Sequence, residues 1–175
     1  MDFAIESKSS KKPGLTQCLY AVYGDLSTVA GPTVGLTQDS KVTITADHVF
    51  TDETNGWRKM FVNLYKSKLE FEGKGDQFSG TGIMRLKCFI PGDEKTNSAF
   101  IKDNPELLFL VQKNPCQTGG HWQLGNKCDA ARVVMSSVKW TSGTIDGNEV
   151  MGWEFDVEAI QDTIYYYEGV VTLPS

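Results

Sequence analysis

The chain has 175 residues, 40% of them hydrophobic, with 17 Lys and Arg against 22 Asp and Glu and a formal net charge of −5. This length suits one domain that buries about 70% of the surface exposed by its unfolded chain. No basic run is longer than two residues, as at Lys11-Lys12. The composition therefore excludes a protein that binds nucleic acid through a basic patch, although nucleic acid could still slide past such a surface.

The N-terminal segment has no apolar signal region, and the chain has no run of about eighteen apolar residues, so we expect no membrane partner. Residues 1–14 mix Ser and Lys and end at Pro13-Gly14, which predicts a flexible N-terminal arm. Residues 15–175 are expected to form a single β-rich domain. The four scattered cysteines are expected to be free buried thiols in a reducing cytoplasm.

Strands are predicted first at 17–23 and 41–47, with a loop over 27–38 between them. The clearest strand runs from Lys66 to Lys74, where charged residues alternate with Leu69 and Phe71. Just before it, Trp57, Met60, Phe61 and Leu64 follow helical spacing, so a short helix is expected there.

A long aromatic segment separates the second strand from the third and contains the turn pair Asn55-Gly56. Loops of this length in a compact domain are usually functional. Two interpretations stay open: the aromatic side chains cap the domain's own core, or the loop projects and contacts a neighbouring subunit. The predicted contact residues are Asp47, His48, Phe50, Asn55, Gly56, Trp57, Met60, Phe61 and Tyr65.

The second half of the chain also favours strands. Residues 80–90 fit a strand and a helix equally well, whereas 106–112 is a continuous apolar run typical of a buried strand. Residues 113–130 are predicted to be a glycine-rich, cysteine-containing loop insertion. Three further strands are expected at 131–140, 149–159 and 163–173, which makes the domain mainly β with about eight strands and at most one helix.

No motif indicates an enzyme, because the sequence has no nucleophile elbow and no evident pair of catalytic acid and base. Cys116, His121 and Cys128 have a spacing that zinc could use, but the tight pair of a zinc knuckle is missing, and a disulfide between the two cysteines is the better alternative. We expect no metal, no cofactor and no catalytic residue. Paired acidic residues on strands, Glu70 with Glu72 and Glu154 with Asp156, are ordinary for solvated faces.

Several segments resemble the major tail protein, or tail tube protein, family of long-tailed bacteriophages. The resemblance covers about half of the chain and lies in KVTITAD, in Gly56-Trp57 followed by RKMFVNLYKS, in LEFEG, and in the C-terminal ARVVMSSVKW, GWEFDVEAI and YYYEGVVTLP. Residues 91–130 depart from the family pattern.

The resemblance implies a β-sandwich or barrel with one flanking α-helix, placed at 80–90, together with a long hairpin loop and an N-terminal arm. It implies hexameric rings that stack into a tube, a virion component assembled in the bacterial host cytoplasm. The implied partners are other copies of the chain, terminator, tape measure and distal tail proteins, and double-stranded DNA that passes without specific binding. The implied acidic lumen lining is Glu70, Glu72, Glu154 and Asp156.

Two other functions remain open from the sequence. One is a different virion part, such as a capsid decoration or tail-completion protein, that does not polymerise. The other, less favoured, is a carbohydrate-binding β-sandwich with Trp122, Trp140 and Trp153 as sugar platforms.

Overall fold

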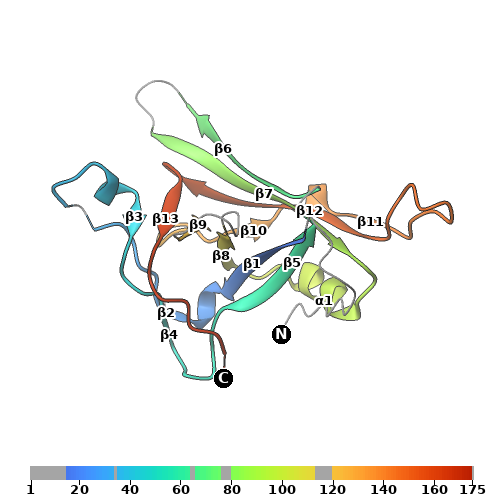
Figure 1. Ribbon diagram of the computed structural model, residues 1–175, viewed down its shortest axis with the longest axis horizontal. Helices are drawn as coiled ribbons and strands as arrows, with labels where there is room; N and C mark the ends of the chain where they lie inside the picture. Colours follow the sequence, from blue (N-terminus) through green and yellow to red (C-terminus); the bar gives the residue numbers. More distant parts are fainter. Residues whose placement is uncertain (1–14, 34, 64–65, 76–79, 113–119, 175) are drawn as a thin grey trace.

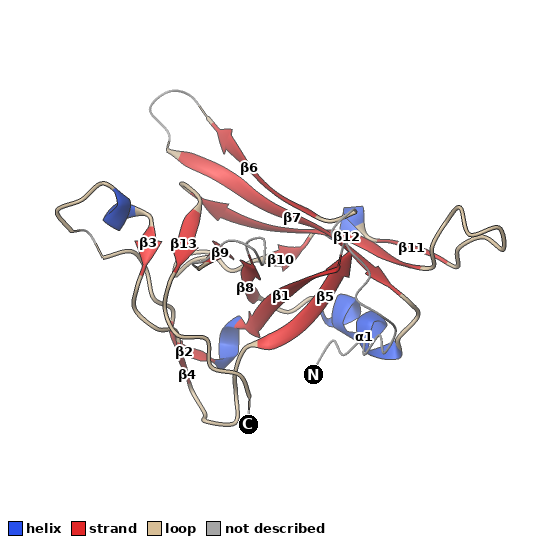
Figure 2. Ribbon diagram, in the orientation of Figure 1, coloured by secondary structure: helices blue, strands red, loops and turns tan. Residues whose placement is uncertain are grey.

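Two β-sheets packed against each other form most of the molecule (Figure 1, Figure 2). The computed structural model describes residues 15–33, 35–63, 66–75, 80–112 and 120–174. The six-stranded sheet has the order β3 (Thr43–Ile44), β13 (Tyr165–Tyr167), β9 (His121–Leu124), β8 (Leu107–Gln112), β1 (Leu15–Val22) and β5 (Arg58–Asn63). Its neighbours pair antiparallel except for β3 with β13.

The second sheet has the order β10 (Arg132–Val133), β12 (Gly152–Gln161), β7 (Thr81–Pro91) and β6 (Lys68–Lys74), and β11 (Lys139–Thr141) also pairs with β12. A small ribbon joins β2 (Leu26–Thr28) to β4 (Val49–Phe50), and short 3₁₀ turns occupy Tyr23–Asp25, Asp39–Lys41 and Met135–Ser137. The mainly-β prediction is therefore confirmed. In the part of the chain that is described, neither sheet closes into a barrel.

The main core lies between the two sheets and follows the period-two pattern of the strands. Leu86 of β7, Phe155 and Val157 of β12, and Phe109 of β8 all point into it and are at most 2% exposed. The other face of β8 carries Leu108, which packs in a second cluster with Ile44, Trp57 and Tyr167. Because β8 is buried on both faces, its sequence is continuously apolar, as predicted for 106–112.

The helix placed at 80–90 by the resemblance is wrong, because these residues form β7, which pairs with β12 over most of its length and with β6 over its first part. The helix is α1 (Lys95–Asp103), in a stretch whose polar composition hid it. It buries Asn97, Phe100 and Ile101, the i, i+3 and i+4 positions of one face. It ends at Asn104, whose φ of 41° is left-handed and whose N–H donates to the carbonyl of Phe100.

Three other predictions of local structure are also wrong. Residues predicted as a short helix after Trp57 form β5, which pairs with β1. Met60 and Val62 of β5 point into the main core. The strand predicted at 41–47 is reduced to two residues of β3. The loop predicted at 113–130 contains β9, although residues 113–119, like the arm at 1–14, lie outside the described residues.

The predicted strands at 131–140 and 163–173 are present in part. The first is interrupted by the 3₁₀ turn between β10 and β11, and the second is limited to β13. After β13 the chain runs beside the start of β5, where the N–H of Trp57 donates to the carbonyl of Thr172. The C-terminal segment therefore helps to cover the six-stranded sheet.

Candidate functional site

The segment predicted to contact a neighbouring subunit is largely packed into the domain itself. His48, Trp57 and Met60 are at most 6% exposed, and Gly56 is also buried. Phe50, Asn55 and Phe61 are half-buried, Asp47 is exposed, and Tyr65 lies outside the described residues. The side chains of His48, Trp57 and Met60 are therefore not available to another subunit. Trp57 packs against the domain's own core, as the capping interpretation expects.

Three aromatic rings surround Trp57. Its ring stands edge-on to Phe50 at 6.0 Å and to His48 at 5.6 Å, and lies 6.4 Å from the ring of Tyr167. At the preceding residue, a Cβ on Gly56 would stand 2.5 Å from the backbone nitrogen of Pro174. The Gly56-Trp57 pair is thus used for close packing against the C-terminal segment.

The four predicted acidic residues share the solvent-facing side of the second sheet. In the register, Glu70 pairs with Arg85 and Arg85 with Glu158, while Asp156 pairs with Lys87. Because side chains alternate along each strand, these residues point away from the main core. The structure therefore brings together side chains from two segments more than eighty residues apart in sequence.

Cations neutralise most of this acidic face. Lys68 is 2.5 Å from Glu70, and Lys74 is 2.5 Å from Glu72. Arg85 contacts both Glu158 and, at 3.9 Å, Asp156. Each hydrogen-bonded lysine lowers the pKa of its glutamate partner, and the hydrogen bond to Glu158 raises the pKa of Arg85. These ion pairs make a mixed-charge face, whereas an acidic surface was expected from Glu70, Glu72, Glu154 and Asp156.

Arg85 lies at the centre of this mixed-charge face and was not predicted as a site residue. Its alternation with buried residues was visible, but the strand-or-helix ambiguity of 80–90 left its neighbours unknown. Glu154 lies opposite Lys139 of β11 in the register, so a basic residue also flanks that edge of the face.

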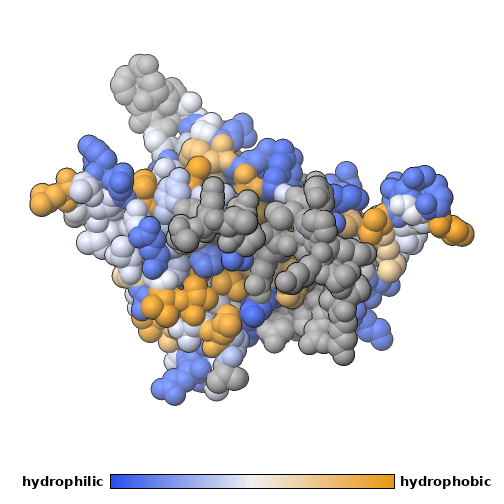
Figure 3. Space-filling model, in the orientation of Figure 1, coloured by the Kyte–Doolittle hydropathy of each residue, from blue (hydrophilic) through white to orange (hydrophobic). Residues whose placement is uncertain are grey.

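Two loops at opposite ends of the molecule carry apolar side chains that their own chain does not cover. One loop connects β2 to β3 and carries Leu36, and the other connects β11 to β12 and carries Ile145 (Figure 1). Leu36 is 107% exposed and Ile145 is 110% exposed. Figure 3 shows hydrophobic atoms at the ends of both projecting loops. An apolar residue among turn residues was the available sequence signal, as in Thr144-Ile145-Asp146-Gly147.

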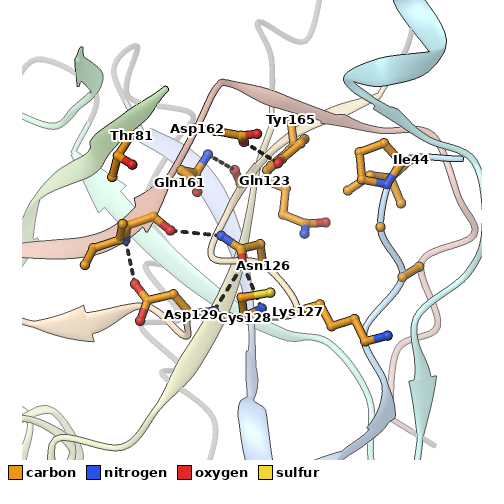
Figure 4. Close-up of a pocket in the computed structure, with 14 residues that line it drawn as sticks. Ile44, Thr81, Gln123, Asn126, Lys127, Cys128, Asp129, Gln161, Asp162 and Tyr165 are labelled. Atoms are coloured by element: carbon orange, nitrogen blue, oxygen red, sulfur yellow. Dashed lines mark hydrogen bonds between the residues drawn. The ribbon is translucent and has the colours of Figure 1, made fainter. Parts of the chain in front are cut away.

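A half-open cavity of about 540 Å³ lies where the ends of β7 and β12 approach β9 and β13 (Figure 4). The polar groups around it are mostly bonded to one another. Asn126 Oδ1 accepts the N–H groups of Cys128 and Asp129, and the Tyr165 hydroxyl donates to Asp162. The cavity therefore has an apolar surface and a self-satisfied polar rim.

Other predicted sites are dispersed or incompletely described. Of the set considered for zinc or for a disulfide, Cys128 is exposed and free, His121 is half-buried, and Cys116 lies outside the described residues. The described residues include no group of three metal-ligating side chains. Trp140 and Trp153 pair across β11 and β12 with ring centroids 6.4 Å apart, but Trp122 belongs to β9 in the other sheet.

Comparison with protein-family models, with curated proteins and with solved structures finds no match for this chain. Among the described residues, no helix is long and apolar enough to span a membrane.

Proposed function

We propose that the chain is a structural virion protein, the major tail tube subunit of a long-tailed bacteriophage, with the fold of that family. In this proposal, hexameric rings stack into a conduit for DNA, and the subunit is assembled in the host cytoplasm before it is part of the tail. Terminator, tape measure and distal tail proteins are its further partners. No catalytic step belongs to this function.

The observation that carries the proposal is the pair of exposed apolar loop ends at opposite ends of the molecule. A fully exposed Leu or Ile costs roughly 1.5–3 kcal/mol relative to its buried state, so both side chains favour a partner surface. Because the two ends differ, a contact between them would be head-to-tail, the kind that closes into rings or extends into filaments.

Open sheet edges give a second, independent support. β6 ends the strand order of its sheet and β5 ends that of the other, so in the described part of the chain no further strand lies beside either of them. Such edges invite pairing with another chain. Assembly of copies would cover the edges of β5 and β6.

The mixed-charge face suits DNA that passes without binding. Affinity for DNA comes from cations that replace the counterions of phosphates, and here Lys68, Lys74 and Arg85 already have carboxylate partners. We therefore assign the outer side of β6, β7 and β12 to the lumen. The acidic lumen of the sequence-based proposal becomes a nearly neutral, ion-paired one.

Electron microscopy of the purified protein tests the proposal. Over a concentration series, negative-stain images are expected to show six-fold rings and stacked tubes, with sedimentation velocity showing the matching shift from monomer. Protein that remains monomeric at every concentration and yields neither rings nor tubes contradicts it. Such a result would instead favour a virion part that does not polymerise, or the carbohydrate-binding alternative, which glycan-array binding would identify.

A further inference from the structure

His48 is a buried histidine whose two ring nitrogens are both used, and it holds together segments that are distant in sequence. Its Nδ1 accepts the N–H of Ala30 at 3.0 Å, and its Nε2 lies 2.9 Å from Oε1 of Gln123 on β9. The ring stacks on Tyr167 of β13 at 4.7 Å with an interplanar angle of 14°. The side chain is thus a junction between the loop after β2 and the six-stranded sheet.

This hydrogen-bond pattern selects one protonation state. The Ala30 backbone N–H can only donate, so Nδ1 must present a lone pair. The Gln123 amide nitrogen donates to the Gly125 carbonyl at 3.1 Å, which turns the amide oxygen toward His48, so Nε2 must carry the hydrogen. Only the neutral imidazole with its hydrogen on Nε2 satisfies both contacts.

We infer that His48 is a proton-sensitive latch: it holds the Ala30 segment on the sheet when neutral and releases it when protonated. A proton on Nδ1 would face the Ala30 N–H and replace an attractive contact by two opposed donors. Ala30 lies near the start of the loop that carries Leu36, and together with Pro32 it also lines the cavity in Figure 4. Release would therefore move an exposed loop and one wall of the cavity.

The surroundings of the ring favour the neutral form. Trp57 just before β5, Gln123 from β9 and Tyr167 from β13 present uncharged groups, and the adjacent Asp47 is the charged group that acts on the ring. Burial lowers the pKa of His48 below its ordinary value of 6.5, against smaller opposite effects of Gln123 and Asp47. Asp47 Oδ1 accepts the N–H of Val170 at 2.7 Å, so its carboxylate is engaged elsewhere.

The sign of the pH effect follows from this lowered pKa. The released segment leaves His48 in water, where it binds a proton at an ordinary pKa, while the latched form resists protonation. The latched state is therefore fully favoured above about pH 6.5 and loses its advantage as the pH falls below that value. Below that value the opening constant grows as the pH falls, by at most tenfold per pH unit, the limiting slope for one proton taken up.

NMR of the intact protein between about pH 8 and pH 5 tests the latch. At the upper pH, the ring ¹⁵N shifts of His48 are expected to show a bare Nδ1 and a protonated Nε2. As the pH falls below 6.5, the amide signals of Ala30, Gly31 and Leu36 should change together with the His48 ring, while the amide of Phe109 in β8 keeps its position. A protonated Nδ1 at the upper pH overturns the inference.

Two variants separate the latch from other titrations. His121→Gln removes the other histidine and should leave the transition of Ala30 unchanged. His48→Asn keeps an acceptor toward Ala30 without a titrating ring, so the Ala30 signal should become independent of pH. A transition that survives in His48→Asn, or disappears in His121→Gln, refutes the latch, and the wild-type ring shifts decide the matter if His48→Asn does not fold.

Discussion

Burial decides the role of Trp57, which is 1% exposed and surrounded by aromatic rings. We expect Trp57→Ala to lower the free energy of unfolding by about 3–5 kcal/mol, because truncation of a buried aromatic removes its burial and leaves a cavity. Chemical denaturation measures this loss directly. The fraction of Trp57→Ala protein that remains folded should assemble like the wild type.

Trp140→Ala is the matched control for Trp57→Ala. Trp140 is 45% exposed on β11 and its ring lies 6.4 Å from that of Trp153, so its truncation should lower the free energy of unfolding by about 0.5–1.5 kcal/mol, much less than truncation of Trp57. If Trp57→Ala instead keeps wild-type stability and abolishes rings or tubes, the assignment of Trp57 to the domain's own core is wrong.

Burial also separates the thiols. Cys18 and Cys88 are 0% and 1% exposed, and burial raises the pKa of Cys18 to about 12 and that of Cys88 well above its ordinary value. Cys128 is exposed. Since the thiolate is the reactive form, iodoacetamide at about pH 8 should modify Cys128 and spare the other two in the folded protein. Peptide mapping by mass spectrometry reads each site, and rapid modification of Cys18 or Cys88 before unfolding would contradict this order.

At the scale of elements, long strands with simple alternation were predictable and elements set by distant partners were not. The strand around Leu69 and Phe71 and the buried run at 106–112 follow from their own sequence. Helical spacing around Trp57 was misleading, because Trp57 and Met60 belong to two different hydrophobic clusters on opposite faces of one sheet. Local periodicity cannot distinguish two cores from one helical face.

Helix α1 was missed for a related reason. Its buried face includes Asn97, a polar residue, so the apolar repeat reduces to Phe100 and Ile101. The residues of β7 show the opposite case, since strand and helix patterns both fit them and the pairing with β6 and β12 decides. The mixed-charge face could be predicted only in part. Alternation along the strand placed Glu70 and Glu72 outward, but the cations beside them depend on the order of the strands in the sheet.

Contact between β7 and β12 depends on a glycine at the start of β12. A Cβ on Gly152 would stand 2.5 Å from the Ile90 carbonyl oxygen, and backbone cannot move away as a flexible side chain can. We expect Gly152→Ala to cost about 1–3 kcal/mol of unfolding free energy, the usual range for overpacking. Denaturant titration of the variant checks this value.

Gly73→Ala tests whether the cost at Gly152 comes from the close approach rather than from strand glycines in general. Gly73 also lies in a strand, β6, but a Cβ there meets nothing within 4 Å. This variant should be neutral or slightly more stable, because alanine restricts the unfolded chain. Equal losses at both positions would contradict the steric explanation.

At the scale of the whole molecule, assembly should depend on the two exposed loop ends and not on the stability of the subunit. Leu36 and Ile145 are more than 100% exposed, so Leu36→Ser and Ile145→Ser remove no contact within the chain and should leave the melting temperature unchanged. If the loops bind neighbouring copies, either change lowers the yield of rings and tubes, because the apolar surface that a partner would bury is lost.

Glu53→Ser provides the control for these loop variants, since Glu53 is exposed on the turn between β4 and β5, away from both projecting loops. It should assemble like the wild type. Sedimentation velocity and negative-stain images at matched concentrations compare the variants. Because a head-to-tail contact uses two different surfaces, a mixture of Leu36→Ser and Ile145→Ser protein should stop at short oligomers if these two loops bind each other. Wild-type assembly by both single variants would exclude the loop ends as subunit contacts and leave the open edges of β5 and β6 to join the copies.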